Sequence, residues 1–589
     1  GLPIELGVEK ELGITKEDIG TKISVEEYNA ACKKAVMRYT DVWNAMTEKV
    51  GYWVDMEDPY ITYKSKYMES VWWLLKQIYD KGLIYKGYTI QPYSPKAGTG
   101  LSSHELNQPG TYQATLPQNL KNLRGDVFFL AWTTTPWTLP SNTALTVGPK
   151  IDYVVVKTFN QYTFEPMYVV LAKSLVGKQF SGKFFEAESD TDFENFSSKD
   201  KKIPYQVVAG AKGQDLVGIR YEQLLDYAQP YQNPENAFRV ISGDFVTTED
   251  GTGIVHTAPT FGADDALVAK LAEPEVPPML VLDENNNPVP LVDLQGRFRP
   301  EMGEYAGKYV KNEYYGDGEA PERSVDVEIA IKLKEENRAF KVEKYVHSYP
   351  NCWRTDKPIL YYPLDSWFIK VTDIKDRMFD LNQTINWKPK ATGEGRFGNW
   401  LANANDWNLS RSRYWGIPLP IWRTEDGKEE LMIGSVAELK EEMQKALKAG
   451  VLEKDIFEDF VVGDMGEDNY DKIDLHKNIV DQITLVSKSG KPMKRESDLI
   501  DVWFDSGSMP YAQWHYPFEN KDLIDEGKTF PADFIAEGVD QTRGWFYTLH
   551  AIATMVFDSV AYKNVVSNGL VLDKEGKKMS KRLGNAVDP

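Results

Sequence analysis

Apolar side chains recur at three- and four-residue steps along the first ninety residues, which is the period of an amphipathic helix. We therefore expect helices between Val25 and Gly87, interrupted by a loop at residues 53–60. Two apolar stripes follow the period, and core packing is the interpretation that we favour for both. They consist of Val36, Tyr39, Val42, Trp43 and Met46, and of Tyr67, Val71, Leu74, Leu75 and Ile78.

The pattern changes to short β-rich runs from about Tyr88 to Tyr345, separated by Gly, Pro and Ser. A stretch rich in Pro and Asn, residues 273–290, indicates a loop within this block. The strands that we expect are residues 127–132, 153–157, 168–172, 254–256 and 279–282.

Short strands and helices alternate again after Ser348. Residues 431–454 predict a charged amphipathic helix, which we interpret as part of a small insertion. Near the end, a strand at 533–537, a helix at 542–557 and a strand at 565–572 predict a parallel β-α-β unit. The layout is that of an α/β domain interrupted by a β-rich insertion.

Length and composition describe a globular protein of several domains, because 589 residues exceed one ordinary core. The net charge of −20 excludes a generally basic nucleic-acid coat protein, although local basic patches stay possible. Two cysteines, Cys32 and Cys352, exclude a disulfide framework and favour a reducing cytosol. None of the six histidines forms a metal-ligand pair at helical spacing, which argues against a His-based metal site, and no apolar run reaches the roughly 20 residues of a membrane helix.

The loop after the last predicted strand is the sharpest local signal. Four cations, at positions 577, 578, 581 and 582, lie between Gly576 and Gly584. A mobile cationic loop at the carboxyl end of a parallel strand can stabilise a leaving pyrophosphate. A solvated basic run or a localisation signal explains the same residues about as well when they are taken alone.

Residues 578–582, Lys-Met-Ser-Lys-Arg, resemble the Lys-Met-Ser-Lys-Ser loop of class I aminoacyl-tRNA synthetases. Segments 406–418, 501–507 and 537–546 also resemble that class, the last two its adenylate site. The sequences of residues 1–5, 412–416 and 540–546 are similar to those of the isoleucyl enzymes, whereas the valyl and leucyl enzymes have different sequences at all three places. The resemblance covers essentially the whole chain.

The resemblance implies an α/β fold in which a Rossmann-like catalytic domain is split by a β-rich editing domain. On this basis we expect catalytic parts at 1–90 and 346–424, the editing domain at 91–345, a small insertion at 425–495, and the second catalytic half at 496–589. The family's His-Ile-Gly-His motif and anticodon-binding domain are absent from the sequence, which also lacks a starting Met, so we expect a fragment that is incomplete for adenylate formation.

The resemblance also implies residue roles in the synthetic site. Glu537 would bind the ammonium group of isoleucyl-adenylate, beside Gly538, Asp540 and Gln541. Trp503 and Trp545 would form apolar walls for the isoleucine side chain, although ordinary core packing explains two tryptophans equally well. Lys578 and Lys581 are the predicted catalytic cations, and Ser580 and Lys581 would contact ATP.

A second constellation lies in the β-rich block and resembles the editing pocket of the isoleucyl, valyl and leucyl enzymes. Asp265 would hold the amino group of a mischarged amino acid, and Thr134 is a second predicted catalytic residue. Thr-rich strands are also simply good β formers, and an Asp pair is also a common helix cap. Thr133, Thr134, Thr135, Asn142 and His256 would line the pocket, and the role of Asp264 relative to Asp265 stays open.

An editing pocket answers a physical limit. One methylene distinguishes isoleucine from valine and gives only about 1–3 kcal/mol of discrimination, a magnitude for which the isoleucyl enzymes are themselves the standard example. A second pocket that admits valine and excludes isoleucine would supply the rest.

Cofactors and partners follow from the same resemblance. We expect ATP with Mg²⁺, L-isoleucine and the tRNA for isoleucine, in a cytoplasmic protein that is monomeric and contacts no membrane. We expect no metal and no zinc, since Cys352 is the one thiol at the positions, 92–98 and 351–355, where many relatives carry Cys pairs. Arg582 replaces the usual Ser, as in isoleucyl enzymes of the eukaryote-like type.

Three alternatives stay open: a fragment that acts only as an editing deacylase, a valyl or leucyl relative, and a non-catalytic tRNA-binding paralogue. A further motif is set aside. Residues 393–398 fit the nucleotide-binding pattern G-x-G-x-x-G, but we expect no strand before them and interpret them as the start of a helix.

Overall fold

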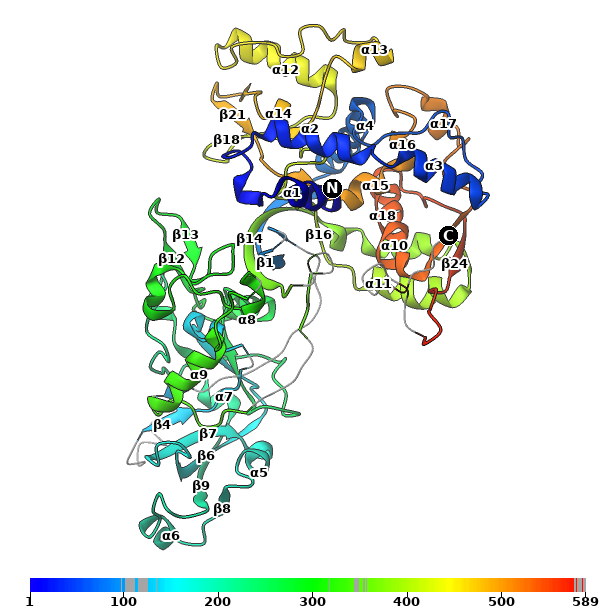
Figure 1. Ribbon diagram of the computed structural model, residues 1–589. Helices are drawn as coiled ribbons and strands as arrows, with labels where there is room; N and C mark the ends of the chain where they lie inside the picture. The colour runs from blue at the N-terminus through cyan, green and yellow to red at the C-terminus, as the bar shows by residue number, and fades with distance from the viewer. Residues whose placement is uncertain are drawn as a thin grey trace. The chain divides into compact units, whose positions relative to one another are not determined.

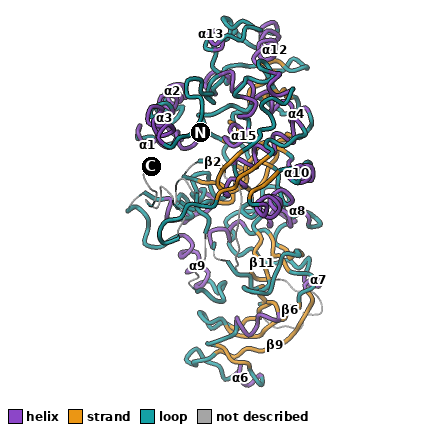
Figure 2. The backbone as a smooth tube through the Cα atoms, turned by 90° about the vertical axis from the view of Figure 1, so that its right-hand side faces the viewer, coloured by secondary structure: helices purple, strands orange, loops and turns teal. Residues whose placement is uncertain are grey.

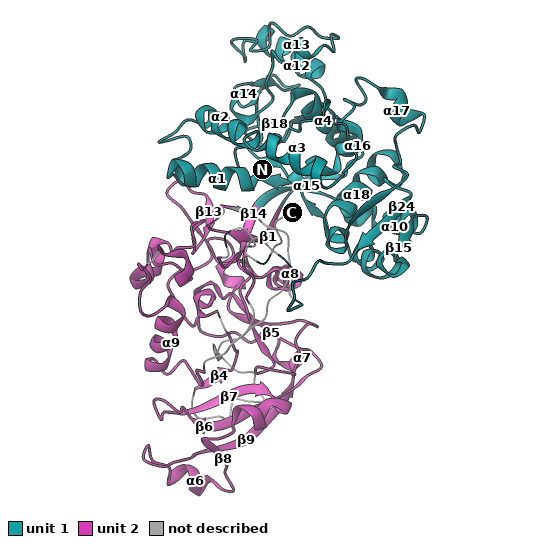
Figure 3. Ribbon diagram, turned by 45° about the vertical axis from the view of Figure 1, so that its right-hand side comes forward, with its two compact units in different colours: residues 1–87, 365–589 teal, residues 88–364 magenta. Residues whose placement is uncertain are grey.

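The computed structural model describes residues 1–96, 98–100, 112–114, 126–133, 135–316, 318–343, 349–352, 355, 357–576, 579 and 585. The chain forms two compact units (Figure 3): unit 1 consists of residues 1–87 and 365–589, and unit 2 of residues 88–364. The insertion predicted from the sequence ended at 345, whereas unit 2 continues to Leu364. The finer division into five parts stays a prediction.

Unit 1 mixes helices with short sheets (Figure 1). Its N-terminal part holds α1 (Leu2–Leu12), α2 (Val25–Val36), α3 (Thr40–Lys49) and α4 (Ser65–Asp80). After the insertion come α10 (Lys375–Asn382), β15 (Asn386–Lys388), α11 (Gly398–Ala402), β16 (Trp407–Asn408), β17 (Ser410–Arg411), β18 (Ile421–Thr424), β19 (Glu430–Met432), α12 (Val436–Lys448), α13 (Glu467–Tyr470), α14 (Lys477–Val480), β20 (Leu485–Val486), β21 (Pro492–Arg495), β22 (Leu499–Ile500), α15 (Val502–Gly507), α16 (Met509–Ala512), α17 (Lys521–Asp525), β23 (Ile535–Gly538), α18 (Trp545–Phe557) and β24 (Asn564–Asn568).

The predicted β-α-β unit is present near the end of the chain. Strands β23 and β24 are parallel neighbours, and β15 extends the sheet in the order β15-β24-β23. Helix α18 connects the two strands, is apolar around most of its surface, and packs against α4, α15 and α10, the last of which lies beside it in Figures 1 and 3. No helix in the part of the chain that the structure describes is long and apolar enough to cross a membrane.

The two apolar stripes predicted near the N-terminus have different fates. The second stripe, which lies on α4 between Tyr67 and Ile78, is confirmed as core, because all five of its residues are at most 3% exposed. The stripe of residues 36–46 was wrongly assigned to the core. Helix α3 has no buried residue, and Tyr39, Val42 and Trp43 are 61–67% exposed. Periodicity identifies an apolar face but not whether anything covers it.

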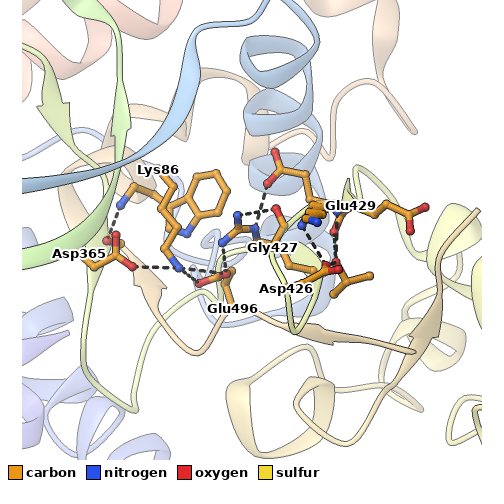
Figure 4. Close-up of polar contacts among 12 residues, drawn as sticks. Lys86, Asp365, Asp426, Gly427, Glu429 and Glu496 are labelled. Carbon is orange, nitrogen blue, oxygen red and sulfur yellow. Dashed lines mark hydrogen bonds and ion pairs between the residues drawn. The ribbon is translucent and has the colours of Figure 1, made fainter. Parts of the chain in front are cut away.

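Strands β1 (Ile84–Ser94) and β14 (Leu360–Ile369) carry the chain out of unit 1 and back, and they are neighbours in the sheet order β16-β14-β1-β2. Ion pairs in unit 1 hold together the two strands where the chain leaves and re-enters this unit (Figure 4). Lys86 Nζ lies 3.2 Å from Asp365 and 3.1 Å from Glu496, and Arg423 also pairs with Glu496 at 3.2 Å. Burial alone would raise the pKa of Glu496, but Lys86 and Arg423 hold it below its usual value.

Unit 2 carries β-sheets joined by loops and short helices (Figure 2), in keeping with the predicted β-rich insertion. A six-stranded sheet has the order β3-β4-β7-β6-β9-β8, and a smaller one the order β10-β5-β11. The elements are β2 (Thr99–Gly100), β3 (Tyr112–Ala114), β4 (Val127–Phe129), β5 (Ala144–Val147), β6 (Asp152–Phe159), β7 (Pro166–Ala172), α5 (Val176–Gln179), β8 (Phe184–Glu186), α6 (Asp190–Glu194), β9 (Ile203–Lys212), α7 (Gly213–Leu216), β10 (Arg239–Ser242), β11 (Ile254–Thr257), α8 (Ala263–Leu271), β12 (Leu280–Leu282), β13 (Pro288–Pro290) and α9 (Val325–Glu335).

The predicted loop at residues 273–290 proved too long. Strands β12 and β13 pair in antiparallel fashion within it, and Asp283 closes the turn between them through bonds from the backbone N–H groups of Asn285 and Asn287. Asn and Pro therefore mark the turn and the edge strand of a hairpin rather than an irregular loop.

The G-x-G-x-x-G segment has a packing role. The expectation that no strand precedes it was wrong, since β15 ends at Lys388, but the segment does begin a helical stretch that continues into α11. A methyl group on Gly393 would lie 2.3 Å from the ring of Trp387, whereas one on Gly395 would meet nothing within 4 Å. The first glycine is thus required by the neighbouring tryptophan.

Replacement of Gly393 by Ala should destabilise unit 1 by about 1–3 kcal/mol, because the added methyl group must displace Trp387. Gly395→Ala is the matched control and should be neutral or stabilising by up to about 1 kcal/mol. Urea denaturation followed by tryptophan fluorescence measures both. Equal losses of stability in the two variants would contradict a packing role confined to Gly393.

Candidate functional site

The first group of predicted site residues lies where strand β23 ends. Glu537 and Gly538 are its last two residues and pair with Ser567 and Asn568 of β24. Asp540 follows in a 3-10 turn, and its carboxylate lies against Gly538, where a methyl group would come within 2.6 Å of Asp540 Oδ1. Carboxyl ends of neighbouring parallel strands are the usual ligand edge of such a sheet.

Trp503, Gln541 and Trp545 meet at the start of α18. The backbone N–H of Trp545 donates to Gln541 Oε1 at 2.9 Å, and its indole N–H donates to the Ser506 carbonyl at 3.0 Å. The ring of Trp503 and the Gln541 amide both approach Gly544, which leaves no room for a side chain there. Trp545 is partly buried against the core, whereas Trp503 is 41% exposed. The structure therefore brings the Trp503 and Gln541 side chains together beside the backbone of Gly544 and Trp545.

Two of the segments that suggested isoleucyl enzymes contact each other. Glu5 is fully buried, and its carboxylate accepts bonds from Arg413 Nε at 3.0 Å and from the backbone N–H groups of Tyr414 and Trp415 at 3.0 and 2.9 Å. Arg413 also pairs with Glu9. A buried carboxylate with this many donors fixes the course of residues 413–415 against α1.

The cationic loop lies largely outside the described residues, as do Lys578, Ser580, Lys581 and Arg582. Met579 is described, and its N–H donates to the Val571 carbonyl at 3.1 Å. Lys578, Ser580 and Lys581 keep the roles predicted for them as predictions.

The second group of predicted residues gathers around β11 in unit 2. His256 lies on this strand, 5% exposed, opposite Leu145 of β5. Its Nδ1 lies 3.0 Å from the Asn142 amide nitrogen, and its Nε2 lies 3.0 Å from the Thr138 hydroxyl. Burial lowers the pKa of His256 to about 3, so the ring is neutral at physiological pH.

The threonines precede this cluster in the chain. Thr133 Oγ1 accepts a bond from the Thr135 N–H at 3.1 Å, and Thr135 leads into a 3-10 turn, Pro136–Ser141. The carbonyl of Thr135 accepts the Thr138 hydroxyl at 2.9 Å. Thr133 and Thr135 are therefore joined to the His256 cluster by hydrogen bonds, and Thr134 lies outside the described residues.

Asp265 is in the first turn of α8, and its Oδ2 accepts the Ala258 N–H at 2.9 Å, just beyond the end of β11. The carboxylate folds back over Gly262, where a methyl group would lie 2.6 Å from Oδ2. Burial raises the pKa of Asp265 to about 6, with a smaller contribution from Asp264. Asp264 itself is exposed. The geometry therefore separates the two carboxylates, and Asp265 alone faces the strand that carries His256.

Within the described residues, no group of three or more His, Cys, Asp or Glu side chains could hold a metal ion. Cys352 is buried and unbridged.

Sequence comparison decides the family. The family model of class I tRNA synthetases (I, L, M and V) matches residues 1–589. The chain belongs to the class I aminoacyl-tRNA synthetases. The predicted fold class, an α/β catalytic domain of this class split by a β-rich insertion, is confirmed.

Individual synthetases show high similarity. The chain is 61% identical over 620 residues to an isoleucine–tRNA ligase of Bacteroides fragilis and 62% identical over 609 residues to that of Cytophaga hutchinsonii. An isoleucine–tRNA ligase of Clostridium tetani is 44% identical over 595 residues. All three alignments cover the whole of this chain and 54%, 52% and 50% of the relative. The chain thus spans about half the length of the curated relatives it matches.

Solved synthetase structures are more distant. A ternary complex of LeuRS, tRNA and LeuAMS from Agrobacterium radiobacter K84 has a TM-score of 0.36 at 15% identity, and covers 100% of this chain and 60% of that one. The structure titled GlLeuRS-CP1 has a TM-score of 0.24 at 16% identity, over 41% of this chain and 99% of that one.

Some residues that contact these two groups, or lie in the same segments, were not identified from the sequence. Tyr221 and Thr138 complete the hydrogen bonding around Asn142 and His256. Asp326 of α9 accepts the Trp137 N–H at 2.9 Å and pairs with Lys311, so it anchors the turn that follows the threonines. Asp505, in the segment 501–507 that resembles an adenylate site, has its pKa raised by burial to about 7. The motif contained Asp505, but Tyr221 and Asp326 carried no local signal.

The raised pKa of Asp265 makes a prediction about stability. An acid with a higher pKa in the folded state binds its proton more tightly when folded, so ionising it costs stability, and the cost is complete above pH 6 or so. Asp265→Asn should therefore stabilise the synthetase by about 1–2 kcal/mol at pH 8 and have little effect at pH 4.

Asp264→Asn is the control, because Asp264 is exposed and should give no such pH dependence. Denaturant unfolding at both pH values measures the two variants. An Asp265→Asn effect that is equal at pH 4 and pH 8 would show that the carboxylate is not destabilised by burial.

Proposed function

We propose that this chain is part of an isoleucine–tRNA ligase, which activates L-isoleucine with ATP, transfers it to its tRNA, and hydrolyses valyl-tRNA formed in error. Identities of 59–62% to isoleucine–tRNA ligases over the whole chain are the observation that carries the proposal. The contact between Glu5 and residues 413–415 supports the proposal, because this contact joins two segments whose sequences are similar to those of the isoleucyl enzymes.

In the synthetic site, Glu537 would bind the substrate ammonium group at the end of β23. Gly538, Asp540 and Gln541 would line the same pocket, and Trp503 and Trp545 would contact the isoleucine side chain. Support comes from the Trp503 and Gln541 side chains, which meet at Gly544, and from the bond of the Trp545 backbone N–H to Gln541. Lys578, Ser580 and Lys581 would contact the ATP phosphates, where cations stabilise the charge on the leaving pyrophosphate. Mg²⁺ would arrive with ATP as part of the substrate.

In the editing site, Asp265 would bind the ammonium group of the misattached valine, within a pocket lined by Thr133, Thr134, Thr135, Asn142 and His256. Its carboxylate suits this role because an incoming ammonium group compensates the cost of ionising it in a partly buried place. Thr134 would assist the hydrolysis of the ester to tRNA.

Further properties belong to the same proposal. We assign the chain to the eukaryote-like isoleucyl enzymes, because Arg582 replaces the usual Ser. We expect no zinc, because the Cys pairs that many relatives carry are missing. We also propose a monomer located in the cytoplasm. A second candidate, an editing deacylase alone, is favoured by one observation: the hydrogen bonds that join Asn142, His256 and Thr138, and the bond from the Ala258 N–H to Asp265, are formed entirely within unit 2.

The proposal is tested by measuring the hydrolysis of valine attached to the tRNA for isoleucine, with the chain and with its Asp265→Ala variant. The parent should release valine and spare isoleucyl-tRNA. The variant should lose roughly 10–100-fold in rate, the value of a charge-assisted hydrogen bond to the substrate ammonium group.

Asp264→Ala provides the matched control and should retain the parent rate, because this carboxylate is exposed. Equal losses in both Asp variants would reject Asp265 as the ammonium site. The isoleucyl assignment would be rejected if the chain hydrolysed an aminoacyl group on a tRNA for another amino acid faster than valine on the tRNA for isoleucine.

A further inference from the structure

Tyr221, on a segment that precedes β10, is 5% exposed and contacts Asn142 of the proposed editing pocket. Its backbone N–H donates to the Phe238 carbonyl at 3.0 Å, and its ring packs edge-on against that of Phe238 at 6.2 Å between centroids. The hydroxyl donates to Asn142 Oδ1. The phenol is therefore held at both ends, and burial raises its pKa well above the usual value, so it stays protonated.

The amide of Asn142 has one possible orientation here. Its nitrogen donates to the Ala144 carbonyl at 2.7 Å, with the Thr257 carbonyl also near at 3.3 Å, and its oxygen receives the Tyr221 hydroxyl. Rotating the amide by half a turn would place its oxygen against the Ala144 and Thr257 carbonyl oxygens, and would remove the oxygen that accepts the Tyr221 hydroxyl. Tyr221 and Ala144 therefore fix which end of the amide faces His256.

This orientation determines the position of the proton on His256. The Asn142 N–H points at Nδ1, so Nδ1 must accept, and a neutral ring then carries its hydrogen on Nε2. Nε2–H donates to the Thr138 hydroxyl at 3.0 Å, and that hydroxyl donates onward to the Thr135 carbonyl at 2.9 Å. The bonds run in one direction from Tyr221 to Thr135.

We propose that Tyr221 is a positioning residue of this pocket, which acts through Asn142 to hold His256 in the Nε2–H form with both ring nitrogens engaged by the protein. The inference rests on the proposed editing function for its role in catalysis. It follows that His256 shapes the pocket and does not accept a proton from the attacking water, since the nitrogen that could accept one already receives the Asn142 N–H.

The proton position can be measured directly by NMR on the chain labelled with ¹⁵N-histidine, because the sequence holds only six histidines. The two nitrogens of a neutral ring differ widely in ¹⁵N shift, and His256→Gln assigns the signals. The parent should show His256 protonated at Nε2 alone. In Tyr221→Phe, which deletes one oxygen atom, Asn142 Oδ1 loses its donor and only the Ala144 and Thr257 carbonyls hold the amide, so the Nδ1–H form of His256 should become detectable beside the Nε2–H form.

Tyr153→Phe is the matched control, since it removes another buried hydroxyl of unit 2, one that bonds the backbone at Gly148 and Gly253. Its His256 signals should equal those of the parent. The other five histidines report whether each variant is folded. An Nδ1–H ring in the parent, or identical His256 signals in Tyr221→Phe and the parent, would overturn the proposal.

Deacylation of valyl-tRNA, measured on the same three proteins, links the proton position to catalysis. Tyr221→Phe should lose activity on the order of tenfold, and Tyr153→Phe should keep it. A change of tautomer with full activity would overturn the catalytic role of Tyr221. A parent that shows the Nε2–H ring but releases no valine would instead count against the proposed function, and leave the positioning of His256 by Tyr221 intact.

Discussion

Loss of water from the polar side chains around β11 is the constraint on which unit 2 depends. His256, Asn142 and Tyr221 are all at most 5% exposed, so each must find its hydrogen-bond partners within the protein. They find them in one another, in Thr138 and in the strand carbonyls of Ala144 and Thr257. The strands thus do more than form a core: the carbonyl groups of Ala144 and Thr257 determine which end of the Asn142 amide faces His256.

The same principle separates two kinds of group among the predicted editing residues. The histidine is neutral and fully bonded, so it contributes shape, whereas Asp265 carries a charge that burial opposes. Such a carboxylate stabilises the protein less than an asparagine would and gains most from a cationic ligand. In unit 1, by contrast, the buried carboxylate of Glu5 is fully matched by Arg413 and two N–H groups, which is the arrangement of a structural residue.

The sequence predicted what depends on local pattern. The apolar run of α18 between two short strands predicted the parallel unit, and the helix of α4 was placed correctly with its buried face. Predictions were wrong where a distant partner decides: α3 has the same periodicity as α4 but nothing described covers Trp43, and β15 is a strand only because β24 pairs with it. Tyr221 is 79 residues from Asn142, so no local motif could have joined them.

The most direct test of the account is the affinity of the chain for a stable amide analogue of the 3′-valyl-adenosine end of tRNA, measured by calorimetry at pH 7.5. The parent should bind it, Asp264→Asn should bind it equally well, and Asp265→Asn should bind it at least roughly tenfold more weakly. Equal affinity in the parent and Asp265→Asn would contradict the claim that this partly buried carboxylate holds the substrate ammonium group.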